Sequence, residues 1–182
     1  MELKMDKTQK LGLVHVYTGA GKGKTTAAMG LALRAVGNGL NVVIIQFMKA
    51  LSPESGEIKA IKRFENARVM RYGGNLLAAD HPPVEIIKED IAKGIAEALK
   101  VIKTGSCDLL ILDEINVAVS MDLANKDNIL GLVKLCKGKV ELVLTGRDAP
   151  QEFILAADYL TEFLMIKHPF EEGITARQGI EF

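Results

Sequence analysis

The stretch TGAGKGKTT, residues 18–26, holds three glycines and two lysines and ends in two consecutive threonines. An apolar run at residues 11–17 precedes it, and an alanine-rich run at residues 25–36 follows it. A strand, a glycine loop and a helix in this order are the context of a phosphate-binding loop. Glycines let several backbone N–H groups point at one anion, and the helix N-terminus adds its positive dipole end. The stretch therefore predicts a triphosphate site, with a simple glycine turn as the alternative.

The side chains of this loop suit the same ligand. Lys24 can place a point charge on the phosphates, and the hydroxyl of Thr25 is suited to Mg²⁺. The loop departs from the usual pattern because its first glycine comes one residue later, at Gly19, and Thr18 stands in the expected position. We expect nucleotide contacts from Gly19, Ala20, Gly21, Lys22, Gly23, Lys24, Thr25 and Thr26.

The composition describes a globular chain without a bulk charge. Its 182 residues suit one domain with a sizeable core, since 48% of them are hydrophobic. Lys and Arg number 23, as do Asp and Glu, so we expect neither general nucleic-acid binding nor membrane binding. Cys107 and Cys136 lack metal spacing and fit a reduced, cytoplasmic setting. We expect a polar tail at residues 1–10 and one domain at residues 11–182.

The rest of the chain alternates predicted strands and helices. Strands are expected at residues 11–17, 41–47, 68–72, 108–113 and 140–145, with an edge strand at residues 159–166. Helices are expected at residues 25–37, 84–103, 126–137 and 150–157, with a short one inside residues 48–65. This alternation predicts a single α/β domain with a mainly parallel sheet flanked by helices. Together with the phosphate loop, it indicates a P-loop NTPase-like (RecA-like) fold. Ligands of such sheets bind beyond the carboxyl ends of the strands.

A second motif, LLILDE at residues 109–114, is an apolar run that ends in two carboxylates. Beside a phosphate loop, Asp113 and Glu114 are interpreted as the acidic partners of Mg²⁺, bound directly or through water, rather than as a solvated loop. The sequence alone does not assign separate roles to the two carboxylates. Arg147 follows a later strand and can reach a triphosphate with its planar fork, with a surface arginine at a turn as the alternative. His168, in the tail, is a candidate for lining the site.

These blocks together resemble the P-loop type of corrinoid adenosyltransferase, a family that transfers adenosine from ATP to cobalamin or its precursors. The resemblance runs from about residue 11 to residue 182. The matching blocks are VYTGAGKGKTTAAMGLALRAVGNG, QFMK with a later Gly-Glu pair, LLILDEINVAV, VLTGRDAP and IKHPFEEGITARQGIEF. A general nucleotide triphosphatase would match only the loop and the acidic strand.

The resemblance implies an unusual use of the glycine loop, in adenosylcobalamin biosynthesis or salvage. ATP is held in reverse orientation, Co(I) of a reduced corrinoid attacks the 5′ carbon of the ribose, and triphosphate leaves. Lys22, Lys24 and Arg147, with Mg²⁺ or Mn²⁺, would stabilise the charge that grows on the leaving group. The residues carried over are Lys24 and Glu114 as catalytic, Thr25, Asp113 and Glu114 as metal ligands, and Arg34 and Arg147 as nucleotide contacts.

The corrinoid-facing loop after the third strand usually carries Phe and Trp in this family, and here it reads YGGNLL at residues 72–77. Leu76 and Leu77 would supply apolar surface instead, with Tyr72 and His168 as further corrinoid-facing residues. The resemblance also implies a flavoprotein electron donor and a homodimer. From the residues alone two alternatives stay open: a conventional P-loop ATPase or kinase that acts on the γ-phosphate, and a nucleotide-dependent corrinoid-binding protein.

Overall fold

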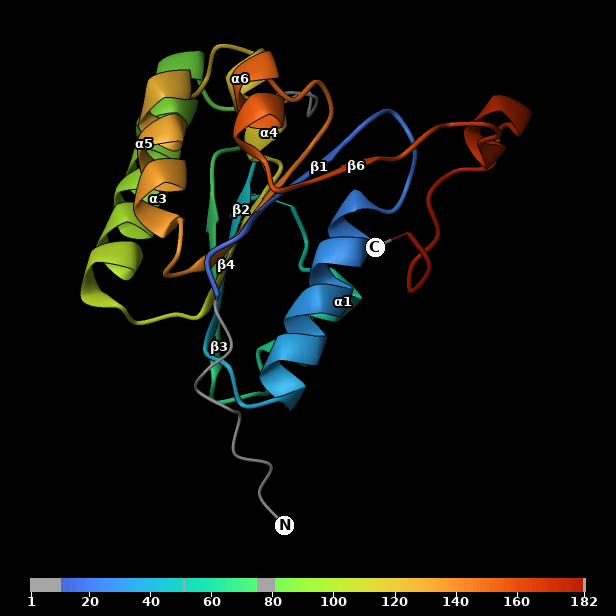
Figure 1. The fold of residues 1–182 in the computed structure, drawn as a ribbon. Helices are drawn as coiled ribbons and strands as arrows, with labels where there is room; N and C mark the ends of the chain where they lie inside the picture. The colour runs from blue at the N-terminus through green and yellow to red at the C-terminus, as the bar shows by residue number, and fades with distance from the viewer. Residues whose placement is uncertain (1–10, 51, 75–80, 182) are drawn as a thin grey trace.

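The computed structural model describes residues 11–50, 52–74 and 81–181. They build a six-stranded sheet flanked by helices (Figure 1). The strand order is β3-β2-β4-β5-β1-β6, and all neighbouring strands run parallel. The strands are β1 (Val14–Thr18), β2 (Val42–Phe47), β3 (Ala67–Tyr72), β4 (Leu109–Asp113), β5 (Glu141–Thr145) and β6 (Tyr159–Glu162). The predicted α/β class and its parallel sheet are confirmed. The predicted polar tail, residues 1–10, lies outside the described residues.

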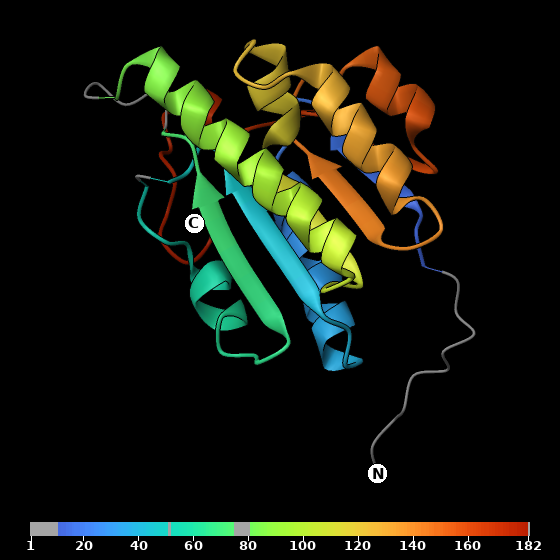
Figure 2. The same cartoon turned by 90° about the vertical axis from the view of Figure 1, so that its left-hand side faces the viewer.

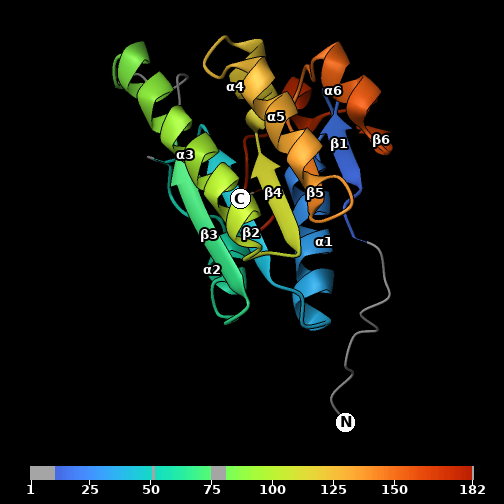
Figure 3. The same ribbon diagram turned by 60° about the vertical axis from the view of Figure 1, so that its left-hand side comes forward.

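Helices cover both faces of the sheet. They are α1 (Lys24–Gly37), α2 (Gly56–Ile61), α3 (Val84–Thr104), α4 (Ile115–Ser120), α5 (Lys126–Cys136) and α6 (Gln151–Ala156), with a short 3-10 turn, η1 (Pro169–Glu172). Figure 2 shows α3 and α5 in front of the sheet, with α1 and α2 behind it, and Figure 3 shows the same layers from an intermediate direction. One buried apolar cluster joins α3, α4, α5 and α6 to the sheet, and a second joins α1 and α2 to its other face. The described residues contain no helix of the length and apolarity that a membrane span requires.

One helix was not predicted. The segment INVAVS, which forms α4, contains the β-branched residues Val117 and Val119, and such residues favour strands. The helix forms because Ile115, Ala118 and Val119 lie on its buried side against the core. Tertiary burial therefore overrides the local preference at this place.

The edge strand is shorter than predicted, because β6 ends at Glu162 rather than at residue 166. The chain leaves the ladder there to contact the glycine loop. The N–H of Phe163 donates to Thr18 O at 2.9 Å, and the N–H of Gly21 donates to Phe163 O at 2.6 Å. Beyond Glu162 the chain therefore does not continue as a strand, and Phe163 hydrogen-bonds instead with Thr18 and Gly21.

The sheet register brings polar residues of three strands to one level at the carboxyl edge. Gln46 of β2 is the direct partner of Asp113 at the end of β4. Leu112 pairs with Leu144 of β5, so Thr145 stands beside Asp113 on the other side. All three polar residues are buried, with an exposure of 0% for Asp113 and Thr145. The order β2-β4-β5 therefore places a polar row next to the glycine loop.

Candidate functional site

The glycine loop connects β1 to α1, as predicted, and the fold adds a reason for its glycines. A Cβ atom at Gly19 would lie 2.5 Å from Phe163 O, and one at Gly21 would lie 2.6 Å from Leu164 O. Gly19 and Gly23 also have φ values of 97° and 117°, a region that side chains with a Cβ rarely enter. The loop must therefore be glycine-rich both to curl and to admit the backbone of residues 163–164.

Lys24 begins α1 and folds back into the loop. Its Nζ atom donates to Gly19 O at 2.7 Å and to Gly21 O at 2.8 Å, and the residue is only 8% exposed. Burial lowers the pKa of Lys24, and the nearby Glu114 carboxylate opposes this shift. The ammonium group is thus held at the wall of the site by the same loop that is predicted to bind phosphate.

Asp113 is the centre of the buried polar row. Its Oδ1 accepts hydrogen bonds from Thr25 Oγ1 at 2.9 Å and Thr145 Oγ1 at 2.7 Å. Its Oδ2 accepts from Gln46 Nε2 and from Lys49 Nζ, both at 3.0 Å. Burial alone would raise the pKa of Asp113, but Lys49 and the hydroxyl hydrogen bonds outweigh burial and lower it. Asp113 is therefore an ionised carboxylate whose two oxygens are each fully engaged.

Glu114 has a different environment from its neighbour. Its φ of 62° is left-handed, and its N–H donates to Thr145 Oγ1 at 3.0 Å. The side chain lines a cavity and is 26% exposed. Burial and then the Asp113 charge raise the pKa of Glu114, while Lys49, Lys24 and Arg147 act in the opposite direction. Of the two carboxylates, Glu114 is the one directed into the cavity.

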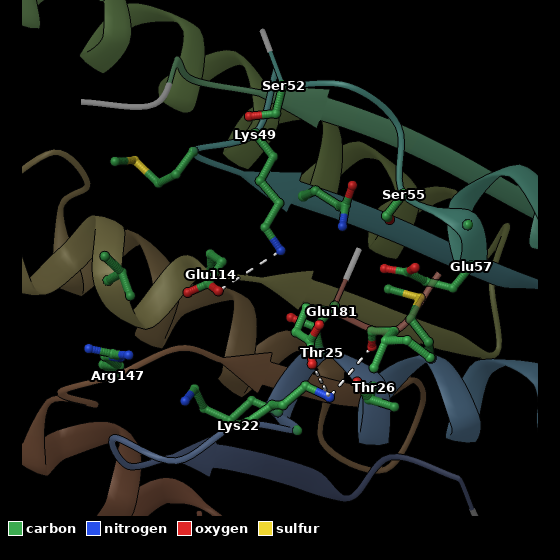
Figure 4. A pocket seen from close by; sticks show the side chains of 18 of the residues that line it. Lys22, Thr25, Thr26, Lys49, Ser52, Ser55, Glu57, Glu114, Arg147 and Glu181 are labelled. Carbon is green, nitrogen blue, oxygen red and sulfur yellow. Dashed lines mark hydrogen bonds and ion pairs between the residues drawn. The ribbon is translucent and has the colours of Figure 1, made fainter. Parts of the chain in front are cut away.

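The cavity has a volume of about 920 Å³ and lies at the carboxyl edge of the sheet. Its walls come from the glycine loop, the ends of β2, β4 and β5, the start of α2 and the C-terminal segment. Figure 4 shows Lys49 beside Glu114, joined to it by an ion pair, with Thr25, Lys22 and Glu181 on the side of the glycine loop. A cavity of this size accepts a nucleotide.

Most of the predicted site residues meet at this cavity. The lining includes Ala20, Gly21, Lys22, Gly23, Lys24, Thr25, Thr26, Glu114, Arg147 and His168. Gly19 belongs to the same loop, and Asp113 lies buried directly behind Thr25. Lys22 is exposed, with its Nζ atom 3.5 Å from Ile180 O and 3.9 Å from Glu181 Oε1. The C-terminal segment therefore borders the glycine loop, although the two are separated by most of the chain.

Three groups of predicted residues do not reach the cavity or are not described. Arg34 lies in the last turn of α1, is exposed and is not among the residues that line the cavity. The ring of Tyr72 packs close to Gly94 of α3 and to the core instead of lining the cavity. Leu76 and Leu77 lie outside the described residues. These residues stay predictions that rest on the resemblance.

Sequence reasoning assigned no role to Lys49, Gln46 and Thr145. Lys49 follows the buried strand β2, and Thr145 ends β5, so each stands where ligands of parallel sheets bind. A polar residue at the end of a buried apolar strand is the available sequence signal, and it was used for Asp113, Glu114 and Arg147 but not for these three residues. The convergence of all three on Asp113 depends on the strand order, which the sequence pattern does not reveal.

The oxygen donors of the site suit Mg²⁺ or Mn²⁺. Over the described ranges, no group of three or more His, Cys, Asp and Glu side chains could hold a metal ion. The site instead offers the Thr25 hydroxyl and the Glu114 carboxylate. Because Thr25 donates its proton to Asp113, its lone pairs are available to a cation. Mg²⁺ commonly takes one or two protein oxygens together with substrate phosphates, and this donor set fits that pattern.

A parallel sheet, a glycine loop that opens a helix, and an acidic strand end beside its threonine define a P-loop nucleotide-binding protein. Comparison with known proteins identifies the family within this class. The sequence model of the family described as ATP:corrinoid adenosyltransferase BtuR/CobO/CobP matches residues 10–182. The chain belongs to this family.

Individual relatives agree with the family match. The corrinoid adenosyltransferase of Pseudomonas aeruginosa is 33% identical over 94% of this chain and 84% of its own length. A corrinoid adenosyltransferase of Sinorhizobium sp is 34% identical, over 97% and 83% of the two chains. The corrinoid adenosyltransferase CobA of Salmonella typhimurium is 29% identical, over 96% and 87%. The similarity thus covers nearly the whole chain and not only the nucleotide loop.

Proposed function

We propose that the protein transfers the 5′-deoxyadenosyl group of ATP to Co(I) of a reduced corrinoid and releases triphosphate, in adenosylcobalamin biosynthesis or salvage. The observation that carries this proposal is the arrangement of the glycine loop and Glu114 around one cavity, in a chain that belongs to the ATP:corrinoid adenosyltransferase family. A conventional ATPase or kinase would share the loop, but it would not account for the match across residues 10–182.

The transfer is a nucleophilic substitution at the 5′ carbon of ATP. The electron pair of Co(I) forms the cobalt–carbon bond, and the bond between the 5′ carbon and its phosphate oxygen breaks. Triphosphate leaves with that electron pair, and the cobalt becomes formally Co(III). No proton has to move in this step, so the protein acts mainly by orienting the reactants and by stabilising the leaving charge.

The cationic side chains of the cavity are suited to a departing triphosphate. Lys24 is fixed in the loop by two carbonyl groups, whereas Lys22 and Arg147 are exposed side chains that reach the same cavity. Because Lys24 is already in place before the bond breaks, it adds stabilisation without further reorganisation. We assign the triphosphate to the glycine loop, with Lys24 as its principal charge partner.

The metal ligands follow from the same geometry. We assign Thr25 and Glu114 as the residues that would hold Mg²⁺ or Mn²⁺, and Asp113 as the group that orients the Thr25 hydroxyl. Both Asp113 oxygens already accept two hydrogen bonds each, which leaves them less available to a cation. When bound, the metal supplies positive charge to the phosphate oxygens.

The proposal is tested by incubating the protein with ATP, Mg²⁺ and chemically reduced cobalamin. We expect triphosphate and a light-sensitive alkylcobalt product, identified by phosphate analysis and by the corrinoid spectrum. ADP and phosphate formed without corrinoid dependence would instead identify an ATPase. Nucleotide-dependent corrinoid binding without any product would identify a corrinoid-binding protein.

We also propose that the protein is a homodimer. The edge strand β6 exposes all four of its residues, including Tyr159 and Leu160, and the exposed Leu164 and Ile166 follow it. An exposed apolar strand edge favours association with another chain. Sedimentation analysis at assay concentrations is expected to give twice the monomer mass, and a monomer under these conditions would contradict the proposal.

A reductant is required, because the corrinoid reacts as Co(I). We propose a flavoprotein electron donor and a cytoplasmic setting, in which the buried free thiols of Cys107 and Cys136 stay reduced. A reduced flavoprotein should replace the chemical reductant in the assay above. Failure of every flavoprotein reductant, with the chemical reductant still effective, would argue against this partner.

A further inference from the structure

Lys49 connects the two carboxylates of the site. Its Nζ atom lies 3.0 Å from Asp113 Oδ2 and 3.9 Å from Glu114 Oε1. The side chain is 30% exposed and lines the cavity. In Figure 4 it enters from the end of β2, on the opposite side from Lys22 and Thr25. One ammonium group thus spans a buried carboxylate and a carboxylate that faces the cavity.

The backbone around Lys49 is held in place by its neighbours. Met48 has a left-handed φ of 62°, which is unfavourable for a residue with a side chain. The Arg71 guanidinium donates to Lys49 O, and the N–H of Ala50 donates to Gly73 O at 2.9 Å. Such strain persists where surrounding contacts over-determine the backbone, and it is frequent at functional sites. These contacts direct the Lys49 side chain over the end of the sheet.

The charge of Lys49 is the one that Asp113 requires. Its other three hydrogen-bond donors, Thr25, Thr145 and Gln46, are neutral. Among residues 11–50, 52–74 and 81–181, Lys49 is the one residue that forms an ion pair with Asp113. A fully buried carboxylate needs a paired charge, because removing an unpaired ion from water is strongly unfavourable. Without Lys49, two adjacent carboxylates would also repel each other.

We propose that Lys49 is a positioning residue for the metal–triphosphate site. It compensates Asp113, which orients the Thr25 hydroxyl, and it holds Glu114 toward the cavity. It therefore supports both residues that would hold the metal, from the side opposite the glycine loop. This inference rests on the proposed function, since it assumes that the cavity binds a metal–triphosphate.

The test uses Lys49→Gln, which keeps a hydrogen-bond donor for Asp113 and removes the charge. Binding of Mn²⁺ in the presence of inorganic triphosphate is measured by electron paramagnetic resonance, without corrinoid and without turnover. We expect binding about tenfold weaker than in the wild type, as for other groups that orient metal ligands. Lys49→Arg, which keeps the charge, should restore most of the affinity. Lys59→Gln, an exposed lysine of α2, is the matched control.

The direction in which Mn²⁺ affinity changes in Lys49→Gln distinguishes a positioning role from a purely electrostatic one. If Lys49 acted only as a distant positive charge, its removal would strengthen binding of a divalent cation. Tighter or unchanged Mn²⁺ binding in Lys49→Gln would therefore overturn the proposal. Weaker Mn²⁺ binding in Lys49→Gln, with most of the affinity restored in Lys49→Arg, supports it.

Folding of each variant is checked by thermal melting. If Lys49→Gln does not fold, Lys49→Arg decides: wild-type Mn²⁺ affinity supports the proposal, and a tenfold loss contradicts it. Absence of adenosyl transfer in the wild type would reject the proposed function without changing the Mn²⁺ comparison, so the two failures are distinguishable.

Discussion

Lys24→Ala is expected to lower kcat/KM for adenosyl transfer by about 10²–10³, the usual loss when one preorganised charge partner is removed. The expectation follows from the position of the Nζ atom, which is held at 2.7 Å and 2.8 Å from two carbonyl oxygens of the glycine loop. The variant loses the cation and also the contacts that fix the loop. Steady-state measurement of triphosphate release with reduced cobalamin gives the comparison.

Lys22→Ala tests whether a positive charge in the loop is sufficient or whether, as for Lys24, the charge must be held in place by hydrogen bonds. Lys22 belongs to the same loop, but its side chain is 50% exposed and its Nζ atom lies 3.5 Å from Ile180 O and 3.9 Å from Glu181 Oε1 of the C-terminal segment. We therefore expect a smaller loss of kcat/KM than for Lys24→Ala, because a mobile and solvated charge stabilises less. Equal losses in both variants would show that fixation of Lys24 by the loop has no role. Retention of wild-type kcat/KM in Lys24→Ala would exclude Lys24 from catalysis.

Asp113→Asn is expected to lower the free energy of unfolding by about 3 kcal/mol and to abolish efficient transfer. The amide would bring two donors into a place where Thr25, Thr145, Gln46 and Lys49 all donate. At least one buried donor would then lack an acceptor, and Lys49 would lose its buried partner. Urea unfolding at pH 7 measures the change in stability.

The loss of stability in Asp113→Asn is expected to depend on pH in a defined direction. Because the pKa of Asp113 is lowered in the folded protein, its stabilising effect is present above the ordinary carboxyl pKa. The effect is lost as the pH falls through the lowered folded-state pKa. The stability difference between wild type and Asp113→Asn should thus be complete at pH 7 and shrink in strong acid. A difference that does not shrink in acid would contradict the assignment.

Asp122→Asn is the matched control for this substitution. Asp122 is exposed and has a left-handed φ of 56°, a conformation that Asn also tolerates. We expect a change in unfolding free energy within about 0.5 kcal/mol, as for other surface substitutions. A loss comparable to that of Asp113→Asn would show that the buried network is not the source of the effect.

Much of the secondary structure was predictable because periodicity and glycine position are local properties. The glycine loop at residues 18–26 and the acidic strand end at residues 109–114 were identified on that basis. The unpredicted helix α4 shows the limit of local rules, since burial of Ile115, Ala118 and Val119 outweighs the strand preference of its valines.

The candidate site was predictable only in part. The chain pattern located Lys24, Thr25, Asp113 and Glu114, since each belongs to a motif with recognisable spacing. It assigned no role to Lys49, because a lysine that follows a buried strand does not by itself indicate which side chain it contacts. Its contact with Asp113 joins residues 64 positions apart, so it depends on β2 and β4 being neighbours in the sheet.

The sequence by itself determined an α/β domain with a phosphate loop, an acidic strand end and a full-length family resemblance. The tertiary structure decided which groups act together. It placed β5 between β4 and β1 and packed residues 163–164 against the loop glycines. It also buried Asp113 under four donors and left Glu114 facing the cavity. The physical reason is that helix and strand formation respond to local periodicity, whereas strand order and side-chain convergence depend on contacts between distant parts of the chain.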